Sequence, residues 1–269
     1  CRTALLSAIN TNRQMGVVTN ALQKSTEKLS SGYKINRAAD DAAGLSISEK
    51  MRSQIRGLNK ASDNAQDGIS LIQVAEGALN ETHSILQRMN ELATQAANDT
   101  NTSVDRQSIK DEIKQLNEEL DRISSTTQFN KQDLLTGGFS GKLQVGALEG
   151  QTMDVKISLA VSAKGLNVSA VEVSTNAKAG AAMQSIQDAI ESVSKQRSKL
   201  GAIQNRLEHT INNLDTNAEN TQAAESRIRD TDMADEMVQY SKNNILSQAG
   251  QSMLTQANQQ TQGVLSLLG

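Results

Sequence analysis

Residues 186–214 read IQDAIESVSKQRSKLGAIQNRLEHTINNL and carry the clearest repeat in the chain. An apolar residue occupies every seventh position of this stretch: Ile186, Val193, Leu200, Leu207 and Leu214. A spacing of seven is typical of the seam of a coiled coil, in which helices pack lengthwise. The stretch therefore predicts a long helix that needs a partner, because an isolated amphipathic helix cannot bury its apolar stripe.

A second repeat of the same kind lies earlier in the chain and supplies the expected partner. Its apolar positions are Ile72, Ala75, Leu79, Leu86, Met89, Ala93 and Ala96. Apolar residues at helical spacing between 109 and 123 predict a third helix. Because the two repeats flank the middle of the chain, their pairing would bring the N- and C-terminal segments together at one end.

Short alternating segments between the repeats predict a small β-hairpin. Residues 142–147 and 152–159 alternate as strands do, and Gly146 and Gly150 fit the turn between them. Residues 160–178 have no helical period. The expected fold class is therefore mostly α: elongated antiparallel coiled-coil helices with a small β-hairpin insert and with the N- and C-terminal helices paired.

The composition favours helices packed by aliphatic side chains. The chain contains no proline, although average usage of about 5% would give roughly 13 in 269 residues. Tyr33, Phe129, Phe139 and Tyr240 are its aromatic residues. A net charge of −3 offers no basic surface to nucleic acid or anionic membranes. No apolar run approaches the ~20 residues of a membrane-spanning helix. We expect neither nucleic-acid nor membrane partners.

Residues capable of catalysis do not gather in the sequence. His83 and His209 both fall in helical patterns, and the single cysteine, Cys1, gives them no metal-binding partner. The acid pairs at 40–41 and 118–119 consist of neighbours, which point in different directions on a helix and form no dyad. We therefore expect no enzyme activity, no cofactor and no metal site.

Several stretches resemble a known family. Residues 27–48, EKLSSGYKINRAADDAAGLSIS, are similar to the N-terminal signature of bacterial flagellin. The similarity continues through residues 65–71 and 127–130, and residues 225–259 and 264–268 resemble the C-terminal part of the family. The first residues, CRTAL, and the final glycine depart from the usual family pattern.

The resemblance implies a structural protein. A flagellin is exported through the hollow flagellum without a cleaved signal peptide and polymerises outside the cell into the filament that serves motility. The implied partners are further copies of the chain in a helical homopolymer, a flagellar export chaperone, and the filament cap and hook-junction proteins. Two alternatives are a hook–filament junction protein, which shares the terminal coils, and a chemoreceptor-like signalling coiled coil, which would lack the strands.

The expected domain organisation is symmetric about the insert. Residues 1–40 and 231–269 form the two halves of an inner-core coil. Residues 41–139 and 179–230 form the two parts of a middle helical domain, and residues 140–178 form a short variable insert with the hairpin.

Two sets of functional residues are predicted, one for polymerisation and one for receptor binding. The apolar stripes near both ends are too weak to fold alone, which predicts that contacts between subunits bury them. The polymerisation residues expected on this ground are Leu6, Ile9, Leu22, Leu29, Met237, Ile245, Met253, Val264 and Leu265. The resemblance also implies that the flagellin-sensing Toll-like receptor of a host binds Arg88, Leu92 and Glu112. Arg88 and Leu92 are four apart and share a helix face.

Overall fold

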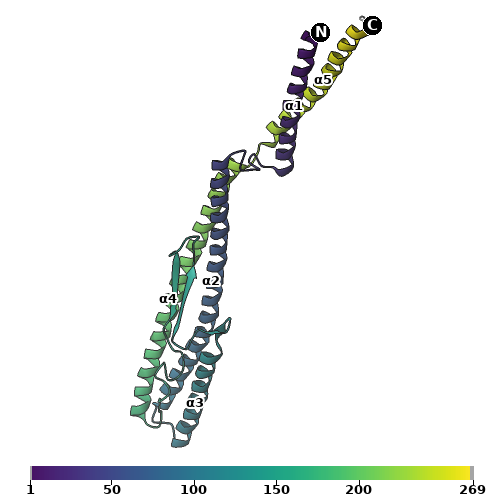
Figure 1. The fold of residues 1–269 in the computed structure, drawn as a ribbon. Helices are drawn as coiled ribbons and strands as arrows, with labels where there is room; N and C mark the ends of the chain where they lie inside the picture. The colour runs from purple at the N-terminus through teal and green to yellow at the C-terminus, as the bar shows by residue number, and fades with distance from the viewer. Residues whose placement is uncertain (1, 267–269) are drawn as a thin grey trace. The chain divides into compact units, whose positions relative to one another are not determined.

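The protein is mostly helical, as the repeats predict. The structure, a computed structural model, describes the backbone of residues 2–266 and the surroundings of side chains 8–257 and 259. Its elements are drawn in Figure 1. The helices are α1 (Arg2–Ser31), α2 (Ala42–Ala96), α3 (Ser103–Thr126), α4 (Asn176–Arg229) and α5 (Met233–Ser266). The strands are β1 (Gln128–Phe129), β2 (Gln132–Asp133), β3 (Phe139–Gln144) and β4 (Thr152–Ile157).

The chain divides into two compact units. The first contains the residues up to Ser53 together with those from Glu219 onward, and the second is Gln54–Ala218. The first unit holds α1 and α5, the start of α2 and the end of α4. The second holds the remainder of α2 and α4 together with α3 and all four strands.

The two heptad repeats pair in the second unit, which confirms the prediction made from their spacing. Leu79 and Leu86 of α2 and Leu200 and Leu207 of α4 are fully buried in one apolar cluster. Leu120 of α3 belongs to the same cluster. Polar groups cross the seam too: Ser62 Oγ donates a hydrogen bond to Asp215 Oδ1 at 3.0 Å. Glu76 of α2 pairs with Arg197 of α4 at 3.7 Å, so the two helices run antiparallel.

The predicted hairpin is present, but its first strand is shifted. β3 and β4 pair antiparallel with Leu143 opposite Met153, and β3 ends at Gln144 instead of Ala147. The Gln144 side chain explains the early end, because its Nε2 donates to the carbonyl oxygens of Gly146 and Leu148, both at 2.8 Å. These bonds fold the following residues into the turn.

A second antiparallel pair, β1 with β2, was not predicted. Two residues join these strands, and Asn130 and Lys131 both have positive φ, 49° and 63°. Two consecutive residues of this conformation give the tight hairpin turn whose twist matches that of the strands. Neither position is a glycine, so the usual sequence signal for such a turn is missing.

Two glycines of α2 allow the β3–β4 hairpin to approach the helix closely. A Cβ atom on Gly68 would overlap the Leu143 side chain, and one on Gly57 would lie 2.8 Å from Ala147 Cβ. Gly77 on the same helix faces open space.

These contacts predict opposite outcomes for the same substitution. Gly77→Ala should stabilise the protein by about 0.5–1 kcal/mol because alanine favours the helix. Gly57→Ala and Gly68→Ala should each be less stable than Gly77→Ala by about 1–3 kcal/mol, because the added methyl group forces the hairpin outward. Urea unfolding of the three variants measures the difference. Equal stabilisation by all three would show that the hairpin does not need these glycines.

Candidate functional site

The terminal helices form the core of the first unit. α1 and α5 lie side by side along their length (Figure 1). They are antiparallel: Lys28 near the end of α1 pairs with Glu236 near the start of α5 at 3.5 Å. Further along, a Cβ on Gly250 would lie 3.9 Å from Met15 Cγ. The predicted pairing of the N- and C-terminal helices is thus confirmed.

This helix pair exposes many large apolar side chains. On α1, Ile9 and Val17 are 58% and 59% exposed. On α5 the exposed residues are Met233, Met237, Val238, Ile245, Leu246 and Met253, at 44–66%. In the described part of the second unit the corresponding residues are Val74, Val104 and Leu148. Exposed apolar side chains gathered on one element mark an interaction surface. We call the eight exposed residues of α1 and α5 the terminal apolar surface.

The predicted polymerisation residues fall into three groups. Ile9, Met237, Ile245 and Met253 belong to the terminal apolar surface. Leu22 and Leu29 are half-buried on α1. The side chains of Leu6, Val264 and Leu265 lie outside the described residues.

Four members of the terminal apolar surface were missed, and one of them, Met233, is the first residue of α5. Val17 lies on α1, and Val238 and Leu246 each follow a predicted residue, Met237 or Ile245, on α5. Neighbours in a helix point about 100° apart, so α5 is apolar over a wider arc than one stripe. The adjacent apolar pairs 237–238 and 245–246 were the available signal.

Arg229, the last residue of α4, holds the connections between the helices of the first unit together. Its guanidinium lies 4.6 Å from the centre of the Tyr33 ring and 3.0 Å from Glu49 Oε1. The backbone N–H of Lys34 donates to the Arg229 carbonyl at 2.6 Å. The N–H of Thr231 donates to the Gly32 carbonyl at 3.0 Å. The segment after α1 is thereby fixed to the segment before α5.

The acidic residues in these connections have structural roles. Asp40 accepts hydrogen bonds from the backbone N–H of Arg37 and of Asn36, which lower the pKa of its carboxyl group. Asp41 accepts from the N–H of Gly44 at 2.9 Å in the first turn of α2. Asp232 accepts from the N–H of Ala234 at 2.9 Å and caps α5. Each of the three carboxylates therefore accepts hydrogen bonds from backbone N–H groups at a turn or at the start of a helix.

The predicted receptor-binding residues lie in the second unit and are not equally accessible. Arg88 Nε donates to Glu112 Oε1 at 3.0 Å, and Arg88 Nη1 lies 3.2 Å from Glu91 Oε2. The hydrogen bond with Glu112 is the main reason why the pKa of Arg88 is raised. Arg88 and Glu112 are exposed, whereas Leu92 is only 2% exposed and packs in the core cluster. Leu92 therefore belongs to the apolar core and offers a binding partner little apolar surface.

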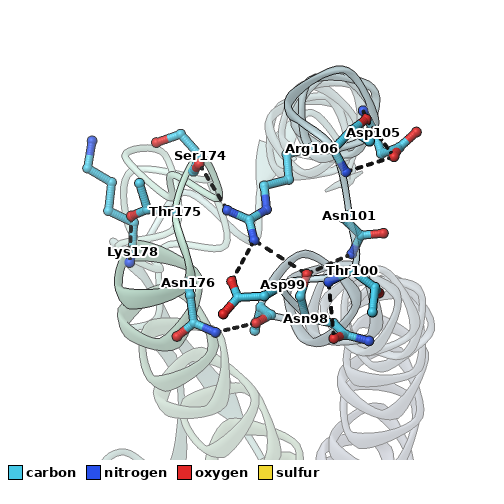
Figure 2. Close-up of polar contacts among 12 residues, drawn as sticks. Asn98, Asp99, Thr100, Asn101, Asp105, Arg106, Ser174, Thr175, Asn176 and Lys178 are labelled. Atoms are coloured by element: carbon cyan, nitrogen blue, oxygen red, sulfur yellow. Dashed lines mark hydrogen bonds and ion pairs between the residues drawn. The ribbon is translucent and has the colours of Figure 1, made fainter.

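A polar network closes the end of the second unit at which α2 ends and α3 and α4 begin (Figure 2). Arg106 Nη2 donates to Asp99 Oδ1 at 3.0 Å, and Arg106 Nη1 reaches the Ser174 carbonyl at 3.5 Å. Asn176 Nδ2 donates to the Ala97 carbonyl. The network ties the loop between α2 and α3 to the start of α4.

Thr102 caps α3 next to this network. Its hydroxyl accepts from the N–H of Asp105 at 3.3 Å, while its own N–H donates to the Asp105 carboxylate at 2.9 Å. The Thr102 hydroxyl also donates to Asp105 Oδ2 at 2.7 Å, and this bond, followed by that from the Thr102 N–H, lowers the pKa of Asp105. The arrangement satisfies N–H groups that a helix end leaves unpaired.

The described residues contain neither a candidate metal cluster nor a candidate membrane span. Within residues 2–266, no group of three or more His, Cys, Asp and Glu side chains could hold a metal ion. Over the same range, no helix is both long enough and apolar enough to cross a membrane.

Comparison with known proteins identifies the same family at both ends of the chain. Residues 3–140 match the family described as the bacterial flagellin N-terminal helical region, and residues 183–268 match the bacterial flagellin C-terminal helical region. A flagellin of Halalkalibacterium halodurans is 56% identical over 265 residues, covering 98% of this chain and 97% of that protein. The flagellar filament 31.3 kDa core protein of Treponema maltophilum is 50% identical over 279 residues, covering 98% of each. The crystal structure of Bacillus cereus flagellin, 34% identical, matches with a TM-score of 0.52 over 61% of this chain and 94% of that chain. The chain belongs to the bacterial flagellin family.

Proposed function

We propose that this chain is the structural subunit of an extracellular bacterial flagellar filament used for motility. The terminal apolar surface is the observation that carries the proposal. Its side chains lie on both α1 and α5, and no other part of the described chain buries them. Contacts between different faces of identical subunits generate open helical fibres when the rotation between neighbours does not close a ring. The relative named as a flagellar filament core protein supports the same assignment.

Electron microscopy of reassembled protein tests the proposal. Filaments are dissociated by heat, and the subunits are then cooled and seeded with short filament fragments. Long helical tubes are the expected product. Subunits that remain soluble oligomers under these conditions would contradict the assignment.

Full-length similarity favours the filament subunit over both alternatives. The chain aligns over 98% of its length with the flagellin of H. halodurans and leaves 3% of that protein unmatched. A hook–filament junction protein shares the terminal coils but gives no reason for this end-to-end match. A chemoreceptor-like coiled coil would lack the β3–β4 hairpin.

The terminal apolar surface also supports the remaining partners. Six of its eight residues lie on α5, so free subunits would aggregate unless this helix is covered before assembly. A flagellar export chaperone that binds α5, acting on a subunit exported without a cleaved signal peptide, meets this need. Filament cap and hook-junction proteins would contact the same helices at the two ends of the polymer.

A second proposed function is recognition of the free subunit by the flagellin-sensing Toll-like receptor. The exposed Arg88–Glu112 pair supports it, because a guanidinium donates two parallel hydrogen bonds and can exchange one carboxylate partner for another. Because Leu92 is buried, the proposed receptor contact depends on these two side chains and their surroundings.

Arg88→Ala should therefore weaken receptor binding by about 1–3 kcal/mol, or roughly fivefold to 150-fold in Kd. Surface plasmon resonance with the receptor ectodomain measures the change. Arg122→Ala is the matched control, since it removes an exposed guanidinium paired with Glu119 on α3. The proposal fails if Arg88→Ala binds as tightly as the control does.

A further inference from the structure

We propose that Met233, Met237 and Met253 make filament assembly sensitive to oxidants. A peroxide converts their thioethers to sulfoxides in the free subunit, and the oxidised subunit no longer polymerises. This inference rests on the proposed function, because it requires that the terminal apolar surface is buried between subunits.

The methionines divide sharply by exposure. The chain contains eight, and all lie among the residues whose side chains are described. The three that are exposed, at 48%, 51% and 60%, are Met233, Met237 and Met253, and all are on α5. Met89 and Met153 are buried in the second unit. Met15, Met51 and Met183 are half-buried.

The chemistry needs only a peroxide. The thioether sulfur attacks one oxygen of hydrogen peroxide and the O–O bond breaks. The other oxygen leaves as water, taking up the proton that the transferred oxygen loses. Sulfur is oxidised by two electrons, the peroxide is reduced by two, and one S–O bond forms. Susceptibility of methionine to oxidation follows exposure, so the three side chains on α5 should react first.

The product changes the character of the terminal apolar surface. Methionine is flexible and polarisable, and it adapts well to irregular apolar interfaces. The sulfoxide is polar and chiral, and burying it without a hydrogen-bond donor is unfavourable. The three positions lie on the same helix as Val238, Ile245 and Leu246. Every copy carries all three, so the loss recurs at each subunit contact.

Assembly should also protect these residues. Once the terminal apolar surface is covered by neighbouring subunits, the sulfur atoms are removed from the solution that carries the oxidant. Oxidation would then stop new growth and leave existing filament intact.

The test treats free subunits and intact filaments with the same peroxide, and the three exposed methionines of α5 should stay unoxidised in the filaments. Cys1 is first alkylated so that its thiol does not react. Subunits are treated with hydrogen peroxide, the excess is removed with catalase, and each methionine is followed by peptide mass spectrometry. We expect Met233, Met237 and Met253 to be oxidised well before Met89 and Met153. The critical concentration for assembly should then rise about tenfold or more, which corresponds to about 1.4 kcal/mol per subunit.

Two further arms separate a specific effect from general damage. Methionine sulfoxide reductases for both epimers should restore assembly of the oxidised subunit. The triple variant Met233→Leu, Met237→Leu, Met253→Leu nearly conserves volume, and its critical concentration, whatever its untreated value, should not change after peroxide. If this variant fails to assemble even untreated, the inference is tested by whether the reductases restore assembly of the oxidised natural sequence.

The outcomes distinguish this inference from the function on which it rests. Untreated subunits that never polymerise contradict the filament assignment itself. The inference alone is overturned if subunits carrying the three sulfoxides assemble normally. It is also overturned if the leucine variant assembles untreated but loses assembly after peroxide as the natural sequence does.

Discussion

Replacing Ile245 with aspartate is expected to abolish filament formation while the subunit remains folded. Ile245 is 66% exposed on α5, so the stability of the free subunit should change by less than about 1 kcal/mol. In the filament the same position would place an unpaired carboxylate in an apolar contact, at a cost of several kcal/mol. The penalty is repeated in every subunit. Sedimentation and electron microscopy measure assembly, and circular dichroism confirms the fold.

Val104→Asp is the matched control for this experiment. Val104 is 71% exposed on α3 in the second unit and lies outside the terminal apolar surface. A normal yield of filaments from Val104→Asp, with none from Ile245→Asp, would locate the assembly contact on the terminal helices. Equal assembly by both variants would remove Ile245 from it.

The largest expected effect on stability comes from the seam in the second unit. Leu86→Ala should lower the free energy of unfolding by about 2–5 kcal/mol, because Leu86 is fully buried and its removal leaves a cavity. Urea unfolding of the free subunit, followed by circular dichroism, measures the change.

Val74→Ala provides the comparison on the same helix. Val74 is 42% exposed, so its truncation should change the free energy of unfolding by no more than about 0.5 kcal/mol. Similar losses from Leu86→Ala and Val74→Ala would mean that the heptad positions do not form the core of this unit.

The helical part of the fold could be predicted because its physical causes are local and periodic. A seven-residue repeat places Leu79 and Leu86 on one face of α2, and these residues are buried as the repeat requires. The repeat in α4 does the same for Leu200. Two helix ends likewise have local causes. Gly32 adopts a positive φ of 75° directly after α1, and Asp232 caps α5.

Contacts between distant segments could not be predicted in the same way. A seam between two helices buries only its a and d positions. Leu92 is buried as well because a third helix, α3, packs beside α2 and widens the covered arc. The sequence indicates that α3 exists but not which flank of α2 it covers. The contact of Arg229 with Tyr33 likewise joins residues far apart in the chain, and no short sequence motif predicts it.

The candidate site was only partly predictable for a related reason. Apolar spacing identified Ile9, Met237, Ile245 and Met253, yet the same spacing also selected Leu22 and Leu29. Spacing identifies an apolar residue without saying whether it faces the partner helix or the solvent. That choice depends on how α1 and α5 are rotated against each other.

The hydrogen bond between Ser62 and Asp215 gives the paired helices resistance to slippage. An apolar seam that repeats every seven residues can largely re-form after one helix slides by a heptad, a translation of about 10 Å. Such a slide would separate the Ser62 hydroxyl from its carboxylate and leave a buried polar group unpaired, at a cost of about 1–3 kcal/mol. Under a load along the helix axes, the polar pair therefore keeps α2 and α4 in one register where leucines alone would permit several.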